Sequence, residues 1–217
     1  MIQQLHTNKQ LVTASIGVVW LLHISALIGV GLGYGEWFLS LSVWNLLLTF
    51  LLLVLMAPIW GMRAVGLSVL FFTVGIGVEW LGVNQGLIFG EYTYGENLGF
   101  KWQGVPLIIG VNWVILVWIS GILSSHLFSN KLLASLGGAV LMVLLDLAIE
   151  QVAPAMDFWQ FNVGHAPLTN YVGWFVVSWF LHAIFQFAGL TGQKRFAVHV
   201  YLCQLVFFIS MMFLIHV

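Results

Sequence analysis

Residues 105–127 read VPLIIGVNWVILVWISGILSSHL, an apolar run of 23 residues with no Asp, Glu, Lys or Arg. As an α-helix this run would be about 35 Å long, enough to cross the roughly 30 Å hydrocarbon core of a bilayer. Because lipid offers the backbone no hydrogen-bond partners, a run of this kind is expected to be helical. Six further mostly apolar runs flank it, at residues 12–32, 37–57, 64–83, 131–152, 171–189 and 196–216.

The composition of the whole chain agrees with these runs. Charged residues make up 6% of its 217 residues, and its mean hydropathy is +1.05. A soluble protein carries about 25% charged residues, so lipid must be the solvent for most of this chain. The sequence therefore predicts an all-α polytopic membrane protein with about seven transmembrane helices, in one domain spanning residues 1–217. The net charge of −1 offers no basic surface for nucleic acid.

The six basic residues predict how the chain is oriented. If the N-terminus lies inside the cell, five of them fall on the cytoplasmic side and only Lys101 falls outside. An excess of Lys and Arg in cytoplasmic connections is typical of membrane proteins. The sequence thus predicts an N-in, C-out orientation. The five inner residues are Lys9, Arg63, Lys131, Lys194 and Arg195.

The two longest connections both lie on the predicted outer side. Residues 84–104 read NQGLIFGEYTYGENLGFKWQG, and residues 153–170 read APAMDFWQFNVGHAPLTN. Both are rich in glycine and aromatic residues. An aromatic belt at the membrane interface accounts for such a composition. The alternative is that both connections fold back over the helix ends and cover a pocket.

Four polar residues within the runs are expected at one depth. Glu79 lies near the outer end of its run, Asp146 and Glu150 lie four residues apart in theirs, and Asn112 enters from the outer side. A spacing of four residues places both carboxyls on one helix face. Ionisable groups inside a membrane are costly and mark a functional site by default. Each of the four is expected within about two helical turns of the outer boundary.

These carboxyls admit two interpretations. Polar groups also join helices in lipid, at about 0.6 kcal/mol per contact. However, no Lys or Arg lies among the three carboxyls to neutralise them, and burial disfavours the charged form of a carboxyl. A carboxyl that keeps its proton in an apolar pocket is a proton donor, which favours general-acid catalysis.

Other site types lack the residues they require. The single cysteine, Cys203, excludes an intrachain disulfide, and the histidine spacings do not match a zinc or di-iron site. There is no phosphate-binding glycine loop, dinucleotide fingerprint or nucleophile elbow. The last run contains no lysine for a retinal Schiff base. His23, His182 and His199 are expected to form hydrogen bonds between helices, Ser178, His182 and Gln186 lie four residues apart in a polar stripe, and His165 is a candidate to face the pocket.

Two groups of residues lie in the outer connections and the runs beside them. The first comprises Glu79, Gly82, Gly86, Phe89, Gly90, Tyr92, Tyr94, Gly95, Leu98, Gly99, Gly104, Val105, Pro106, Asn112 and Trp113. The second comprises Asp146, Glu150, Val152, Ala153, Trp159, Pro167, Asn170, Tyr171, Gly173, Trp174 and Phe175. With these residues the chain resembles the membrane carotenoid 1,2-hydratases, which include γ-carotene 1′,2′-hydratases and bisanhydrobacterioruberin hydratases. It departs from them at Gln151, where the family often has proline, and at Phe158 and Phe161, near which the family often has a second tryptophan.

The resemblance implies that water is added across the terminal C1–C2 double bond of an acyclic carotenoid ψ-end. A proton goes to C2 and water captures the tertiary cation at C1, so neither a cofactor nor a metal is implied. The implied partners are the carotenoid, water and membrane lipid. The implied location is a bacterial or archaeal cytoplasmic membrane.

The resemblance also implies a role for each candidate residue. Asp146 or Glu150 would deliver the proton, while the other of the pair, or Glu79, would act as base on the water. The aromatic residues expected to stabilise the cation are Trp113, Trp159, Tyr92, Tyr94 and Trp174. Asn112 and Asn170 are expected to hold water or the carboxyls.

Three alternatives remain at this stage. A carotenoid isomerase or cyclase would use the same initial protonation. A small proton-coupled transporter would use the carboxyls as a proton relay, but such proteins often contain internal repeats, and none is visible here. A structural subunit would not require three carboxyls at one depth.

Overall fold

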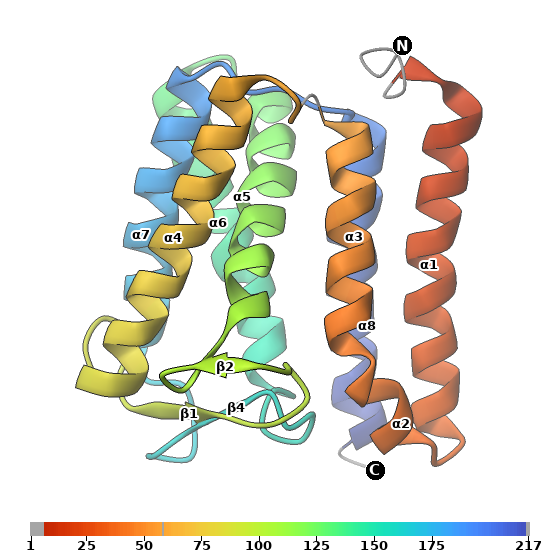
Figure 1. Cartoon of the computed structure of the whole chain (residues 1–217), viewed down its shortest axis with the longest axis vertical. Helices are drawn as coiled ribbons and strands as arrows, with labels where there is room; N and C mark the ends of the chain where they lie inside the picture. The colour runs from red at the N-terminus through yellow and green to blue at the C-terminus, as the bar shows by residue number, and fades with distance from the viewer. Residues whose placement is uncertain (1–6, 58, 216–217) are drawn as a thin grey trace.

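The computed structural model describes residues 7–57 and 59–215, which form a bundle of helices closed at one end by short strands (Figure 1). Six helices among these residues are long and apolar enough to cross a membrane. They are α1 (Lys9–Gly31), α4 (Met62–Gln85), α5 (Leu107–Leu127), α6 (Lys131–Glu150), α7 (Leu168–Phe187) and α8 (Lys194–Ile215). The predicted all-α membrane fold is confirmed, and the protein is an integral, multi-pass membrane protein. Residue 216, at the end of the last predicted run, lies outside the described residues.

The second predicted run, residues 37–57, differs from the other six. It comprises a short helix, α2 (Gly35–Ser40), and the 15-residue helix α3 (Ser42–Met56). At 1.5 Å per residue α3 is about 22 Å long, which is less than the hydrocarbon core. It nevertheless runs along the bundle between the same two ends as the longer helices (Figure 1). The start of α1 and the end of α8 therefore lie at opposite ends, as an odd number of passes requires.

Hydroxyl groups explain why the backbone can break between α2 and α3 inside an apolar segment. The Ser40 Oγ donates to the carbonyl of Trp37 at 2.8 Å, and the Ser42 Oγ donates to the carbonyl of Leu39 at 2.6 Å. Serine side chains can satisfy backbone groups that lose their helical partners. The hydropathy of this segment predicts a continuous helix because the two serines do not interrupt it.

Basic residues gather at the end of the bundle where α1, α4, α6 and α8 begin (Figure 1). Two of these helices begin with an asparagine cap. Asn8 accepts from the backbone N–H of residues 10 and 11 at 3.0 and 3.2 Å, and Asn130 caps α6 in the same way. Such caps satisfy N–H groups that have no partner within the helix. The predicted separation of five basic residues from Lys101 is present, and the N-in orientation stays a prediction.

Helix α5 is the centre of the bundle and packs against α3, α4, α6, α7 and α8. Glycine allows its closest approach to α7, since a Cβ on Gly121 would lie 2.8 Å from Phe185 Cδ1. Hydrogen bonds add to this packing. The Gln186 Nε2 donates to the Gly121 carbonyl at 2.9 Å, and His182 Nε2 lies 2.7 Å from Ser120 Oγ. The interhelical hydrogen bond predicted for His182 is therefore present, whereas Ser178 of the same stripe donates to carbonyls of its own helix.

The other two central histidines differ from each other. Trp20 of α1 donates to His199 Nδ1 of α8 at 3.2 Å, which is the predicted interhelical bond. His23 Nδ1 instead lies 2.8 Å from the carbonyl of Val19 in its own helix. The prediction of an interhelical hydrogen bond is therefore wrong for His23.

The two long outer connections meet over the end of the bundle opposite the basic residues (Figure 1). Strand β1 (Tyr92–Tyr94) pairs antiparallel with β4 (Trp159–Phe161), and β2 (Lys101–Trp102) pairs with β3 (Val105–Pro106). We call residues 86–106 and 151–167 the roof. The pairing of β1 with β4 sets the aromatic residues of both connections against each other above the ends of α4 and α6.

Candidate active site

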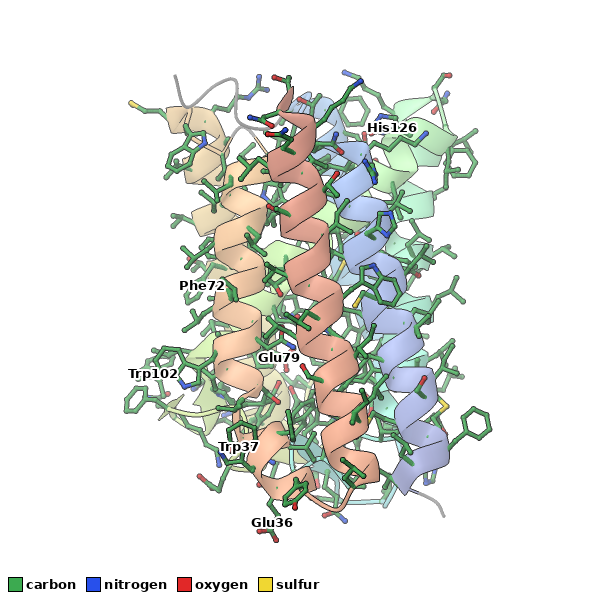
Figure 2. The ribbon with its side chains drawn as sticks, turned by 90° about the vertical axis from the view of Figure 1, so that its right-hand side faces the viewer. Glu36, Trp37, Phe72, Glu79, Trp102 and His126 are labelled. Carbon is green, nitrogen blue, oxygen red and sulfur yellow. The ribbon has the colours of Figure 1, made fainter. Side chains whose placement is uncertain are left out.

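The three predicted carboxyls face one small cavity beneath the roof. Its volume is about 20 Å³, and we call it the acid pocket. Figure 2 shows Glu79 inside the bundle, nearer the end that carries Trp37 than the end that carries His126. The lining residues are Glu79, Phe89, Tyr92, Tyr94, Ile109, Asn112, Asp146, Ile149, Glu150, Trp159, Phe161, Asn170 and Trp174.

Glu79 accepts hydrogen bonds from three aromatic side chains. Its Oε2 accepts from the Tyr92 hydroxyl and, at 2.6 Å, from the Tyr94 hydroxyl. Its Oε1 accepts from Trp113 Nε1 at 3.0 Å. Both oxygens are thus engaged as acceptors, and the side chain is 3% exposed. This carboxyl ties the roof to α4 and α5, and each of its oxygens already has a donor.

A glycine makes room for this arrangement. A Cβ on Gly82, one turn beyond Glu79 on α4, would lie 2.7 Å from Tyr92 Cε1 and 2.8 Å from its hydroxyl oxygen. The tyrosine ring therefore lies where any larger residue at position 82 would stand. This explains why a glycine three residues after the carboxyl suits the site.

The two roof tyrosines remain hydrogen-bond donors over the physiological pH range. Burial raises the pKa of Tyr92 and of Tyr94 well above the usual value, and the nearby charge of Glu79 raises both further. Desolvation disfavours phenolate, as does a neighbouring carboxylate. Neither phenol is therefore expected to ionise while the roof is closed.

Asp146 and Glu150 share a single amide donor. The Asn170 Nδ2 lies 3.1 Å from Asp146 Oδ2 and 3.0 Å from Glu150 Oε1. Trp159 Nε1 donates to Glu150 Oε2 at 3.1 Å, so both oxygens of Glu150 have donors. The remaining oxygen, Asp146 Oδ1, is buried and has no hydrogen-bond partner among the described residues. Asp146 is therefore the carboxyl with an oxygen left for a proton or for a reacting group.

Aromatic rings surround the carboxyls. Trp113 and Trp174 stack with ring centroids 4.4 Å apart and an angle of 8° between their planes. Phe89 lies 6.0 Å from Trp174, and Tyr94 lies 6.0 Å from Trp159. Aromatic faces attract cations through their quadrupole. The wall of the pocket can thus stabilise positive charge without supplying a nucleophile.

The roof is also fixed from above by polar contacts within it. The side chain of Asp157 accepts from the backbone N–H of Glu96 at 2.8 Å, and Asn97 Nδ2 donates to the Met156 carbonyl at 2.9 Å. Lys101 Nζ donates to the carbonyl of residue 94 at 2.9 Å and pairs with Glu96 at 2.8 Å. These contacts join the two roof segments and hold β1 above Glu79.

Nine of the ten predicted site residues line the acid pocket, and the tenth, Trp113, lies behind it. Trp113 is fully buried and acts through its bond to Glu79 and its stacking on Trp174. His165 is exposed and is not among the lining residues, so it does not face the pocket. Four lining residues were not predicted as part of the site, namely Phe89, Ile109, Ile149 and Phe161.

Helical spacing could have identified two of these. Ile109 precedes Asn112 by three residues, and Ile149 follows Asp146 by three. Residues three apart share a helix face, so each isoleucine is an apolar neighbour of a polar site residue. Neither isoleucine carries a polar group that would distinguish it from an apolar residue facing lipid.

Comparison with known proteins gives the family. A family model described as "Carotenoid biosynthesis protein" matches residues 40–217, a range that contains every lining residue of the acid pocket. The chain belongs to this carotenoid biosynthesis family. The predicted family resemblance is confirmed at that level.

A curated relative of this carotenoid biosynthesis protein is the bisanhydrobacterioruberin hydratase of Haloarcula japonica. The two are 30% identical over 61% of this chain and 50% of the relative. The chain thus spans about half the length of the curated relative that it matches. No solved structure matches the chain.

Proposed function

We propose that this protein is a carotenoid hydratase that adds water across the terminal C1–C2 double bond of an acyclic ψ-end. The observation that carries the proposal is the buried Oδ1 of Asp146, which has no hydrogen-bond partner within the described part of the chain and lies in a pocket with two further carboxyls and a wall of aromatic rings. Protonating an alkene requires a desolvated acid and a shielded cation. The name of the relative, a hydratase, supports the same reaction.

In the proposed reaction Asp146 carries a proton on Oδ1 and gives it to C2. The π-electron pair of the double bond forms the new C2–H bond and leaves a tertiary cation at C1. A water oxygen then bonds to C1, and the water loses a proton to Glu150. A proton returns to Asp146 from Glu150, one helical turn away, so the cycle consumes only water.

The dimensions of the acid pocket suit this sequence of steps. Its volume of about 20 Å³ admits about one water molecule. Asn112 and Glu150 are polar groups in its wall that can hold the water near C1. Because the pocket has little spare room, few water molecules can compete for the cation.

The aromatic wall supplies the stabilisation that the cation requires. Trp159 and Trp174 both line the pocket. A desolvated cation over an aromatic face gains about 2 kcal/mol. This contribution appears only when the charge forms, which is the condition for accelerating the reaction.

Expression in a host that accumulates an acyclic carotene tests the proposed reaction. We expect a new pigment heavier by one water molecule and carrying a tertiary hydroxyl group, identified by chromatography and mass spectrometry. A host with the empty vector is the control. Unchanged pigments with several acyclic carotenes would contradict the proposal, and a cyclised product of unchanged mass would favour the cyclase alternative.

A further inference from the structure

A second, larger cavity lies beside the acid pocket, in the half of the bundle that includes the roof. It is about 360 Å³ in volume, within the range of roughly 300–1,000 Å³ that is usual for small-molecule sites. Segments of α1, α2, α3, α5, α6 and α8 line it, together with residues of the roof. We call it the side groove. Most of its lining is aliphatic or aromatic, and its polar members are His23, Ser25, Ser42, Asn45, Asn112 and Gln204.

The inner end of the side groove coincides with the wall of the acid pocket. Four residues line both cavities, namely Ile109, Asn112, Ile149 and Trp159. Asn112 and Ile149 come from α5 and α6, and Trp159 comes from the roof. A molecule in the groove would therefore have one end beside the carboxyls.

The outer end of the side groove faces the surroundings of the bundle. Trp37 of α2 and Trp44 of α3 line it and are 61% and 68% exposed. Helix α1 packs mainly against α8 and α3 mainly against α5, so the groove lies between these two pairs. Figure 2 shows this side of the bundle, with Trp37 near the same end as Glu79.

The position of the groove along α1 fixes its depth in the membrane. The lining residues of α1 run from Leu22 to Ala26, about 8–14 Å from the end of that helix at Gly31. The α1 wall of the groove therefore lies within the hydrocarbon layer, while Trp37 lies nearer the end of the bundle. A molecule dissolved in lipid can enter it sideways without passing through water.

We propose that the side groove binds the chain of a linear, apolar isoprenoid polyene. The terminal double bond of the polyene lies at Asn112 and Trp159, and the chain leads out between α1 and α3 into the lipid. This assignment rests on the proposed function and specifies where its substrate binds. Continuity with the acid pocket, the apolar lining and the opening to lipid together favour a long apolar chain over a water-soluble ligand.

A substitution that fills the groove tests this assignment. Ala26 lines the groove, whereas Ala14 of the same helix is exposed and lies outside it. Ala26→Trp is expected to lower conversion of an acyclic carotene by about tenfold or more, because the indole takes the place of the chain. Ala14→Trp is expected to leave conversion within about twofold of the unmodified protein, because a single exposed apolar side chain is ordinary on such a surface. Conversion by Ala26→Trp at the unmodified rate, with normal amounts in the membrane, would overturn the assignment.

A binding measurement separates this assignment from the proposed reaction and does not depend on how well Ala26→Trp folds. Ser25 lines the groove, and the native Cys203 is buried and serves as the background. In Ser25→Cys, lycopene in nanodiscs is expected to slow N-ethylmaleimide labelling about fivefold or more, because a bound chain covers the thiol. Labelling at the same rate with and without lycopene would overturn the groove while leaving hydration intact. Protection of the thiol by lycopene, with no hydrated product formed by the unmodified protein, would support the groove as the binding site and overturn the proposed reaction.

Discussion

Asp146→Asn is expected to lower hydration of an acyclic carotene by about 100- to 10,000-fold, the usual contribution of a general acid. An asparagine amide has nearly the same shape as the carboxyl but cannot protonate C2. The Asn170 Nδ2 lies 3.1 Å from Asp146 Oδ2 and can donate to an amide oxygen as well. The variant should therefore remain folded while it loses the reaction. Product formation per amount of membrane protein is the measurement.

Two matched variants serve as controls for Asp146→Asn. Glu36→Gln makes the same carboxyl-to-amide change at an exposed position of α2, outside the roof and the acid pocket, and should retain most of the activity. Glu150→Gln removes the proposed base and should also lower activity, because the water then has no carboxylate to accept its proton. Full activity in both Asp146→Asn and Glu150→Gln would contradict the assigned roles. Loss of Asp146→Asn from the membrane would indicate that the residue serves helix packing instead.

Glu79→Gln is expected to open the roof and abolish most of the activity. A glutamine offers one carbonyl oxygen where the carboxyl accepts from Tyr92, Tyr94 and Trp113, so at least one buried donor loses its partner. Each hydrogen bond to a charged group contributes about 1.5–3 kcal/mol. The variant should unfold at a lower temperature in detergent. Its roof should detach from α4 first, because two of the three donors to Glu79, Tyr92 and Tyr94, belong to the roof.

Limited proteolysis can detect this release directly. Lys101 is the only lysine or arginine in the roof, so it is the one place there where trypsin can cut. Its Nζ donates to the backbone carbonyl of Tyr94, the residue whose hydroxyl donates to Glu79. Trypsin is expected to cleave after Lys101 about tenfold faster or more in Glu79→Gln, since cleavage follows the population of the open form. Glu36→Gln, an exposed substitution on α2, is the control and should cleave at the unmodified rate. Equal rates in the two variants would show that Glu79 does not hold the roof.

Much of the fold could be predicted from hydropathy because lipid imposes simple rules on a chain. Runs such as 105–127 must form helices in a bilayer, and their lengths follow from its thickness. The spacing of Asp146 and Glu150 likewise follows from helical geometry, since residues four apart share a face. The depth of a residue in the membrane can be predicted as well, because each helix starts at a predictable boundary. Glu79 and Asn112 could therefore be placed at the same depth as Asp146 and Glu150.

The remaining features depend on contacts between distant parts of the chain. The pairing of Tyr94 with Trp159 joins segments 65 positions apart, and no periodicity in either connection predicts that register. The spare oxygen of Asp146 depends on the position of Asn170 between the two carboxyls, which no spacing along the chain predicts. The break at Leu41 escaped prediction because serine hydroxyls satisfy the backbone inside a segment that is apolar on average.

The side groove illustrates the same limit. Its walls come from six helices and from the roof, so no single stretch of sequence contains its pattern. His23 was expected to bond to another helix, yet its ring contributes to the groove wall and contacts Phe207 edge to face at 5.3 Å. An apolar residue that lines a cavity and one that faces lipid look alike in a hydropathy pattern. Only packing distinguishes them.

Isotope incorporation by the purified protein tests the central claim most directly. An acyclic carotene is converted under nitrogen in water labelled with both deuterium and oxygen-18, and the product is examined by mass spectrometry and NMR. The proposed reaction predicts one oxygen-18 at C1 and one deuteron at C2, with about 100-fold less product or lower still from Asp146→Asn. A hydroxyl group that carries no oxygen-18, or a product without a deuteron at C2, would contradict proton-first hydration in the acid pocket.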